Sequence, residues 1–271
     1  MQTLRASLQQ EANRLSSTLT SNWPPQPRST PAAPQGKPRT DNGADPDCPI
    51  CGGLGVYSLD VPFADPRFGK AFPCDCTAAY RAAHLQQISG LTGDELALRL
   101  SDVSEAGPGT AAMLAAAREF VAQPSRMLTL WGGAGNAKTL ILQAVVNECI
   151  ERGVMAVYVT MLDLLEYIRE AYQEGQEGRY GSAWSRMDRV TAVPVLAIDE
   201  VDKIKATEWA IERETAILDK RYRLGLARHV GTLLAMNTNP DRLPEWISSR
   251  LADGRNRIVH NDDPDMRRLM K

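Results

Sequence analysis

The stretch Leu128-Thr-Leu-Trp-Gly-Gly-Ala-Gly-Asn-Ala-Lys-Thr139 decides the fold. Its apolar start predicts a short buried strand over 128–131, and the apolar residues after it predict a helix over 139–152. Between them lies a glycine-rich turn, whose backbone can wrap tightly and point its N–H groups at phosphate oxygens. A helix that begins at such a turn adds the positive end of its dipole. The stretch therefore predicts a phosphate site between a strand and a helix.

The residues that close this turn predict a nucleotide site with magnesium. Lys138 would reach the β- and γ-phosphates, and the Thr139 hydroxyl would ligate Mg²⁺. The pattern G-x-x-x-x-G-K-[ST] is met except at Ala137, which stands where the second glycine is expected. The Cβ of Ala137 either crowds the phosphates or is tolerated if its φ is negative. We expect ATP to be bound by Gly132, Gly133, Ala134, Gly135, Asn136, Ala137, Lys138, Thr139 and Leu140.

A second motif follows an apolar run. Residues 193–198 read Val-Pro-Val-Leu-Ala-Ile, as in a parallel strand buried on both faces, and lead into Asp199 and Glu200. Ligands bind at the carboxyl ends of strands in open α/β sheets. Asp199 is therefore expected to hold the Mg²⁺ shell through water, and Glu200 to polarise the attacking water as general base. The alternative is an acidic solvated loop, which the pairing with the glycine turn disfavours.

Strands and helices alternate along the second half of the chain. Such alternation predicts right-handed βαβ units and a parallel sheet with helices on both faces, a three-layer α/β fold. The polar, glycine-rich stretch 174–188 is expected to be a mobile loop. The other expected strands are 154–160 and 230–236, and the other expected helices are 77–90, 110–120, 162–173 and 207–224.

Composition narrows the class of protein. The chain has 271 residues, 43% of them hydrophobic, and a formal net charge of −2, so it has enough apolar residues for a core and no general attraction to nucleic acid. No apolar run approaches the roughly 20 residues that span a bilayer. The first residues lack the apolar core of a signal peptide. We therefore expect a cytoplasmic protein without a membrane partner, in which thiols stay reduced.

Four of the five cysteines cluster in a way that predicts a metal site. Cys48 and Cys51 form a C-x-x-C turn followed by glycine, and Cys74 and Cys76 follow after a segment short enough to be a hairpin. Four thiolates are typical of tetrahedral Zn²⁺. A unit this small would couple folding to metal binding. The alternatives are free cysteines or a redox pair. Cys149, in a predicted helix, is expected to be a small core residue.

The chain before the nucleotide motifs divides into three parts. Residues 1–21 have leucines on one helical face, so this segment either lies on its own domain or docks a partner. Residues 22–47 are rich in proline and are expected to be a linker. Residues 48–90 are expected to form the zinc module with a following helix. Residues 91–271 would then form the nucleotide-binding domain.

The motifs together resemble those of AAA+ ATPases, and among them the DnaC/IstB group of helicase loaders and transposase helpers. The segments that carry this resemblance are LTLWGGAGNAKT, VPVLAIDEVD, ILDKRY and TLLAMNTNPDRLPEWISSRLADG. The resemblance implies that Asn239 is a polar sensor that helps Glu200, with Asn237 as the fallback. It also implies that Arg250 is an arginine finger acting in trans, and that Arg267 or Arg268 contacts phosphate as a second sensor.

The resemblance also implies a biological role. An ATPase of this group would form a ring or spiral oligomer and load a replicative DNA helicase onto single-stranded DNA, with the zinc module gripping the helicase. DNA contact by the module is the alternative for that part. Two further alternatives for the whole chain are a transposase helper that assembles on duplex DNA and a zinc adaptor that binds nucleotide without turnover. The basic residues that could line a DNA channel, or form solvated helix faces, are Lys203, Lys205, Lys220, Arg221, Arg223, Arg228, Arg255 and Arg257.

Overall fold

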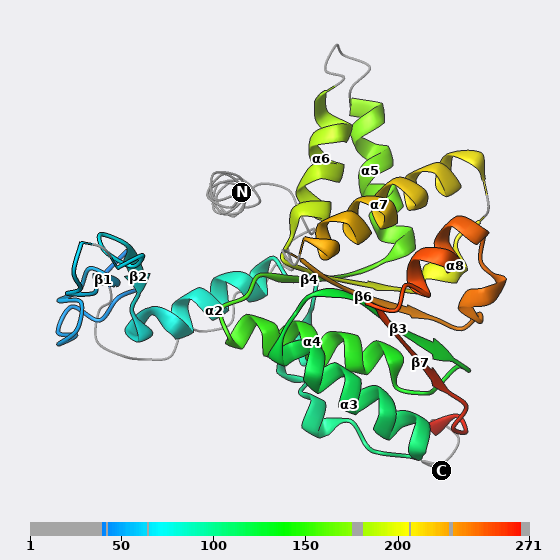
Figure 1. Cartoon of the computed structure of the whole chain (residues 1–271), viewed down its shortest axis with the longest axis horizontal. Coiled ribbons are helices and arrows are strands. Elements are labelled where there is room, and N and C mark those ends of the chain that lie inside the picture. The colour runs from blue at the N-terminus through cyan, green and yellow to red at the C-terminus, as the bar shows by residue number, and fades with distance from the viewer. Residues whose placement is uncertain are drawn as a thin grey trace.

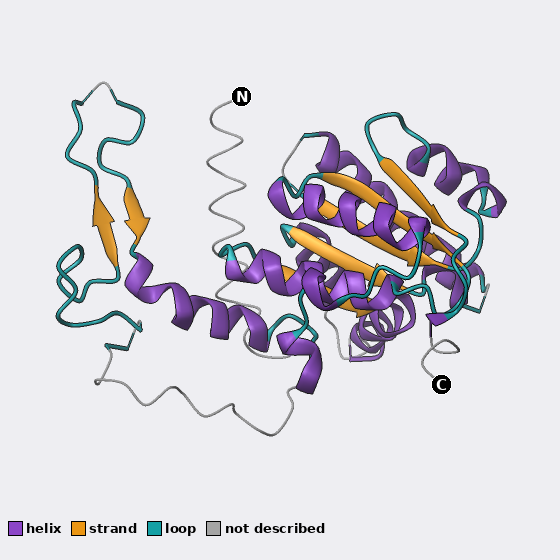
Figure 2. Cartoon of the chain, turned by 90° about the horizontal axis from the view of Figure 1, so that it is seen from below, coloured by secondary structure: helices purple, strands orange, loops and turns teal. Residues whose placement is uncertain are grey.

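The structure is a computed structural model that describes residues 40–41, 43–63, 65–174, 181–205, 207–227 and 230–266. The predicted helix 1–21 and most of the predicted linker 22–47 lie outside the described residues. Two parts are seen in Figures 1 and 2: a domain built on a central sheet, and a small cysteine-bearing part set to one side. We call residues 91–266 the sheet domain and residues 48–77 the cysteine module.

The sheet domain contains five parallel strands in the order β4-β5-β6-β3-β7. The central strands are buried along their whole length, which explains their continuous apolar runs. Every strand ends at the same edge of the sheet, so the residues that follow β3, β5 and β6 meet there. The strands are β3 (Arg126–Gly132), β4 (Ala156–Thr160), β5 (Val195–Asp199), β6 (Gly231–Met236) and β7 (Arg257–Asn261).

Helices cover both faces of this sheet (Figure 1). On one face, α3 (Pro108–Ala122) and α4 (Lys138–Glu151) enclose an apolar cluster with the strands. On the other, a second cluster joins the sheet to α5 (Met161–Glu174), α6 (Gly181–Ala192), α7 (Glu208–Leu226) and α8 (Glu245–Leu251). The connecting 3-10 turns are η3 (Gly93–Ala97), η4 (Leu100–Asp102), η6 (Val201–Lys203) and η7 (Pro240–Arg242). The predicted three-layer α/β fold is confirmed.

Two helix starts show how distant or neighbouring side chains fix these elements. The Asp263 carboxylate accepts hydrogen bonds from the backbone N–H groups of Gly109 and Thr110, so a residue beyond the last strand caps α3. The Thr207 hydroxyl accepts one from Ala210 N–H at the start of α7. The first contact ties the C-terminal segment of the domain to the helix that precedes its first strand.

Three elements differ from the sequence prediction. The stretch 174–188, expected to be a loop, contains most of α6, whose Met187 and Val190 are buried in the second cluster. Strand β7 and helix α8 were not predicted at all. Only Val259 and Asn261 of β7 are buried, because this strand lies at the edge of the sheet. Such an edge strand has little of the apolar pattern that marks an inner one.

The cysteine module is a small hairpin joined to the sheet domain by one helix. Strands β1 (Val56–Ser58) and β2 (Ala71–Pro73) pair antiparallel, as predicted for the segment between the two cysteine pairs. The turn η2 (Asp75–Thr77) leads into α2 (Ala78–Gln87), which reaches the sheet domain beside β4 (Figure 1). Cys149, by contrast, is fully buried in α4, as expected for a core residue.

Candidate functional site

The glycine turn lies between β3 and α4 and packs against residues 261–265. A Cβ at Gly132 would lie 1.9 Å from the carbonyl oxygen of Asn261, and one at Gly135 would lie 1.7 Å from the Asp265 carboxylate. Both glycines also have positive φ, so no other residue fits there without strain. The Lys138 ammonium donates to the carbonyl oxygens of Gly132 and Gly133 at 2.8 and 2.6 Å. The turn therefore curls around the lysine that would meet phosphate.

Ala137 adopts the backbone conformation that glycine favours. Its φ is +59° and its ψ is 7°, in the left-handed region, and the residue is buried. The negative φ under which its Cβ was expected to be tolerated is therefore not observed. An alanine in this region costs of order 1–2 kcal/mol relative to the right-handed conformation. The shape of the motif is thus kept with a strained alanine at the position of the second glycine.

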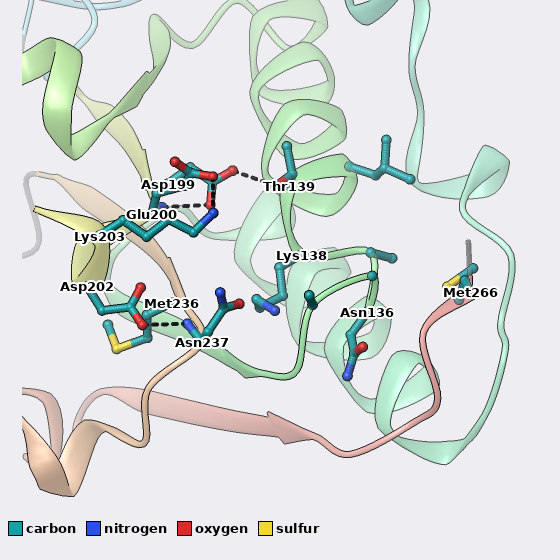
Figure 3. A pocket seen from close by; sticks show the side chains of 14 residues that line it. Asn136, Lys138, Thr139, Asp199, Glu200, Asp202, Lys203, Met236, Asn237 and Met266 are labelled. Atoms are coloured by element: carbon teal, nitrogen blue, oxygen red, sulfur yellow. Dashed lines mark hydrogen bonds and ion pairs between the residues drawn. The ribbon is translucent and has the colours of Figure 1, made fainter. Parts of the chain in front are cut away.

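Asp199 is the centre of a hydrogen-bond cluster at the end of β5 (Figure 3). One of its oxygens, Oδ2, accepts from the Thr139 hydroxyl at 2.6 Å and from the Tyr158 hydroxyl at 3.0 Å. The other, Oδ1, accepts from the backbone N–H of Glu200 at 2.8 Å. The predicted magnesium ligands Thr139 and Asp199, 60 residues apart in sequence, are therefore in direct contact.

Glu200 is held in a strained conformation beside a lysine. Its φ is +55° and its ψ is 38°, which is uncommon for a residue with a side chain and is typical of functional sites. Its carboxylate forms an ion pair with Lys203 Nζ at 2.6 Å. That pair raises the pKa of Lys203, chiefly through the hydrogen bond to Glu200. The candidate general base therefore lies at the site, and its carboxylate is paired with Lys203.

These residues line a cavity of about 350 Å³, within the range of small-molecule sites. Asn237, which follows the end of β6, lines it, whereas the Asn239 side chain accepts from Asp241 N–H and caps η7. The fallback residue thus faces the cavity. Asp202 fixes the backbone that follows β6, because its carboxylate accepts hydrogen bonds from the N–H groups of Asn237 and Thr238. The lining residues are Ala134, Gly135, Asn136, Ala137, Lys138, Thr139, Leu140, Asp199, Glu200, Asp202, Lys203, Met236, Asn237 and Met266.

The predicted arginines lie elsewhere. The Arg250 guanidinium donates to Asp219 on α7 at 3.0 and 2.7 Å and to the carbonyl oxygen of Trp246, away from the cavity of its own chain. Arg267 and Arg268 lie outside the described residues, as does Arg228. One residue of the proposed basic channel is excluded: Arg221 is fully buried and cannot contact DNA.

The four cysteines of the module meet as predicted. Their sulfur atoms all lie within 4.8 Å of one another, and the closest pairs are 3.7 Å for Cys48 with Cys74 and 3.5 Å for Cys51 with Cys76. Four sulfurs at about 2.3 Å from a tetrahedral zinc would be separated by similar distances. Burial raises the pKa of Cys51, but hydrogen bonds, led by that from Gly55 N–H, bring it down to about 7. The donor set therefore fits zinc.

Comparison with known proteins supports the nucleotide site. Residues 103–230, which include both motifs, match the family described as IstB-like ATP binding protein. The nucleotide site is therefore assigned to a part of the chain that is similar to IstB-like ATP binding proteins. The strand order and the position of the cavity at the carboxyl ends of the strands agree with this assignment. No curated protein matches the chain significantly in sequence.

Solved structures share the fold. DnaA from Aquifex aeolicus is 20% identical with a TM-score of 0.53, over 64% of this chain and 52% of that one. The DnaC helicase loader is 18% identical with a TM-score of 0.52, over 62% and 99%. Domain III of Thermotoga maritima DnaA is 20% identical with a TM-score of 0.52, over 65% and 70%. The chain therefore spans about half the length of the Aquifex DnaA structure it matches. Among the described residues, no helix is long and apolar enough to cross a membrane.

Several residues at the site were not predicted to belong to it, among them Tyr158 and Lys203. Tyr158 lies in β4, two residues before its end, and Lys203 follows Glu200 in η6. Neither has a pattern that marks it in sequence. Tyr158 is recognisable only when the neighbouring strands are placed in register, which sets Thr160 beside Asp199.

Proposed function

We propose that this protein is an ATP-driven loader that delivers a replicative DNA helicase onto single-stranded DNA. The observation that carries the proposal is the combination of a DnaC/IstB-like ATPase domain with a cysteine module that presents apolar side chains to solvent. Structural similarity to a helicase loader supports the fold on which this proposal rests. The module supplies the surface that such a loader needs for its partner. We place the protein in the cytoplasm.

In the proposed reaction, Lys138 binds the β- and γ-phosphates, and Thr139 and Asp199 would hold Mg²⁺, which would supply charge neutralisation at the phosphates. Glu200 accepts the proton of the attacking water. To do so it must exchange its ion pair with Lys203 for a contact with water. Asn237 is better placed than Asn239 to orient that water, since only its position lines the cavity.

Arg250 would complete the site of a neighbouring subunit. Its side chain is about one-third exposed and links α8 to Asp219 on α7. An arginine supplied in trans stabilises the charge that develops on the γ-phosphate. A ring or spiral oligomer would therefore hydrolyse ATP much faster than the monomer. Arg267 or Arg268 would contact phosphate within the same chain.

The helicase would bind the apolar face of the cysteine module. Phe63 and Phe68 at the far end of the hairpin are 86% and 50% exposed and stack edge to face at 5.3 Å. Ile50 and Leu54, beside the first cysteine pair, are 60% and 71% exposed. Exposed apolar groups of this size in a small unit mark a protein contact more often than a nucleic-acid contact. Zinc would hold in place the cysteine turn that carries Ile50 and Leu54.

The test measures ATP hydrolysis with single-stranded DNA, duplex DNA or a replicative helicase. We expect stimulation by single strands or helicase, its loss in Arg250→Ala, and a loss of at least about 100-fold in turnover with retained ATP binding in Glu200→Gln. Arg118→Ala is the control, because Arg118 forms an exposed ion pair with Glu105 and is not among the basic residues of the proposed DNA channel. Phe63→Ser should abolish helicase binding and spare basal hydrolysis, whereas Ile258→Ser, exposed on β7, should spare both. Absence of any effect of helicase or single strands contradicts the loader.

A transposase helper is the second candidate, and the match to the IstB-like family favours it. A helper of this kind would be stimulated by duplex DNA and not by single strands or helicase. Turnover under no condition would support the third possibility, an adaptor that only binds nucleotide.

A further inference from the structure

The helix that leaves the cysteine module is fastened to the edge of the sheet. Strand β4 is an edge strand, and its Tyr158 N–H donates to the carbonyl oxygen of Ser89, directly beyond α2, at 2.7 Å. Ser89 is fully buried. The next residue, Gly90, has φ +81°, and a Cβ there would lie 2.1 Å from the carbonyl oxygen of Tyr158. The backbone of this segment thus replaces the missing neighbour of β4 at one position.

The side chain of the same tyrosine reaches the nucleotide site. The Tyr158 hydroxyl donates to Asp199 Oδ2 at 3.0 Å, the oxygen that also accepts from Thr139. Burial, together with the charge of Asp199, raises the pKa of Tyr158, so its hydroxyl keeps the proton that it donates. One residue therefore contacts the exit of α2 through its backbone and the proposed magnesium carboxylate through its side chain.

A second set of contacts joins the same segment to α4. The Gln143 amide donates to the Glu95 carboxylate at 2.6 Å, and the Asn147 amide donates to the carbonyl oxygens of Glu95 and Leu98 at 2.7 and 3.0 Å. Gln143 and Asn147 lie on the helix that begins with Lys138. The chain that continues from α2 is therefore fixed to α4, which carries Lys138 and Thr139, and to β4, whose Tyr158 contacts Asp199.

We infer that Tyr158 is a positioning residue that sets the Asp199 carboxylate for magnesium according to how the end of α2 is seated on β4. The inference rests on the proposed nucleotide site and concerns how that site is regulated. A partner that pulls on the cysteine module moves α2, and the displaced Ser89 and Gly90 release β4 and the tyrosine hydroxyl with it. Nucleotide bound with magnesium, in turn, stabilises the contact between the end of α2 and β4, because coupling between two binding events is reciprocal.

The test is the binding of a fluorescent N-methylanthraniloyl ATP analogue to the full chain, with magnesium and with excess EDTA. Tyr158→Phe removes one hydroxyl and keeps the ring. We expect it to reduce the magnesium-dependent gain in affinity about tenfold, the effect of one hydrogen bond to a charged group, and to leave binding in EDTA unchanged. Gly90→Ala should reduce the same gain in affinity even though Tyr158 keeps its hydroxyl group, because the added Cβ would displace the end of α2 from β4. Tyr80→Phe is the matched control, since its hydroxyl donates to the exposed carbonyl oxygen of Asp41.

Hydrogen exchange supplies a readout that needs no unstable variant. Magnesium with nucleotide should slow exchange of the Tyr158 amide in the native protein, and this protection should be lost in Tyr158→Phe. An unchanged magnesium gain in Tyr158→Phe, or exchange of the Tyr158 amide that ignores magnesium and nucleotide, overturns the inference. Nucleotide binding without any magnesium dependence in the native protein overturns the proposed site as well, so the two failures are distinguishable.

Discussion

The sheet domain and the cysteine module keep their shapes by different means. In the sheet domain, two apolar clusters fill the space above and below the sheet. In the described part of the module, the buried cluster consists of Cys48, Cys51 and Cys74, with Tyr57 and Cys76 against it, while Phe63 and Phe68 face solvent. A region held by apolar burial tolerates loss of one contact, whereas a region held by one metal does not. Loss of metal should therefore unfold the cysteine module alone, and loss of core contacts should destabilise the sheet domain alone.

Removal of the metal is expected to have the largest effect. Structural zinc contributes about 10 kcal/mol or more to the folding of small metal domains, so chelation or Cys74→Ser should unfold the β1–β2 hairpin and leave the sheet domain folded. Elemental analysis should find one zinc per chain, lost in Cys74→Ser. NMR or limited proteolysis should then show disorder confined to residues 48–77. Cys149→Ala, in the core of the sheet domain, is the control that should keep the metal. A module that stays folded without metal would remove the contrast between the two regions.

The second prediction concerns a buried cation in the sheet domain. The Arg221 guanidinium donates to Thr232 Oγ1 and to the carbonyl oxygens of Thr191, Val193 and Gly231, so it ties α7 to the starts of β5 and β6. Burial lowers its pKa to about 9, which still leaves it charged at neutral pH. Arg221→Met removes the donors and leaves these acceptors buried, at a cost of roughly 3 kcal/mol.

Denaturant unfolding with a signal from the sheet domain measures this cost. Arg223→Ala is the matched control on the same helix, since its exposed ion pair with Asp219 should contribute less than about 1 kcal/mol. The hairpin of the module should be unaffected by either change. Equal stability of Arg221→Met and the native protein would show that the buried arginine is replaceable by apolar volume.

Sequence predicted the parts of the site that depend on neighbours in the chain. The turn at 132–139 and the acidic end of β5 are encoded by consecutive residues, and both were found where expected. Parts that depend on distant segments were missed. Helix α6 is polar enough to look like a loop until Met187 and Val190 meet the second cluster. Of the two asparagines that were sensor candidates, Asn237 lines the cavity and Asn239 caps η7, because the turn after β6 decides which of them faces the cavity.

The burial of Arg221 could have been predicted from the sequence. Glu214, Ile217, Leu218 and Arg221 share one face of α7 at helical spacing. That face is buried. A charged residue on the apolar stripe of a helix should be expected to make buried hydrogen bonds rather than to meet DNA.

The third prediction uses the other charged residue of that stripe. Burial raises the pKa of Glu214 from 4.5 to about 7. A carboxyl group with a higher pKa in the folded state holds its proton more tightly there, so the sheet domain should lose stability as pH rises from about 4.5 to about 7. At 1.36 kcal/mol per pKa unit, Glu214→Gln should stabilise the domain by about 3 kcal/mol at pH 8 and have little effect at pH 4.5.

Urea unfolding of the sheet domain at several pH values tests this. Glu212→Gln, exposed on the same helix, should shift stability equally little at every pH. A Glu214→Gln variant that is less stable than the native protein at pH 8 would mean that the carboxylate has a partner when charged.

The smallest effect is expected at Ala137, where strain serves the site rather than the fold. With φ at +59°, alanine loses of order 1–2 kcal/mol that glycine would not lose, but glycine also costs about 0.5–1 kcal/mol of chain entropy. Ala137→Gly should therefore stabilise the sheet domain by only about 0.5 kcal/mol.

If the alanine Cβ also crowds phosphate, the variant should bind ATP several-fold more tightly, whereas an alanine that only bears backbone strain should leave affinity unchanged. Gly153→Ala, also at positive φ but with open space around it, is the control for strain alone: it should destabilise the domain by of order 1 kcal/mol and leave ATP affinity unchanged. Parallel unfolding and nucleotide titrations of these two variants thus separate the cost of the backbone conformation from the cost at the ligand.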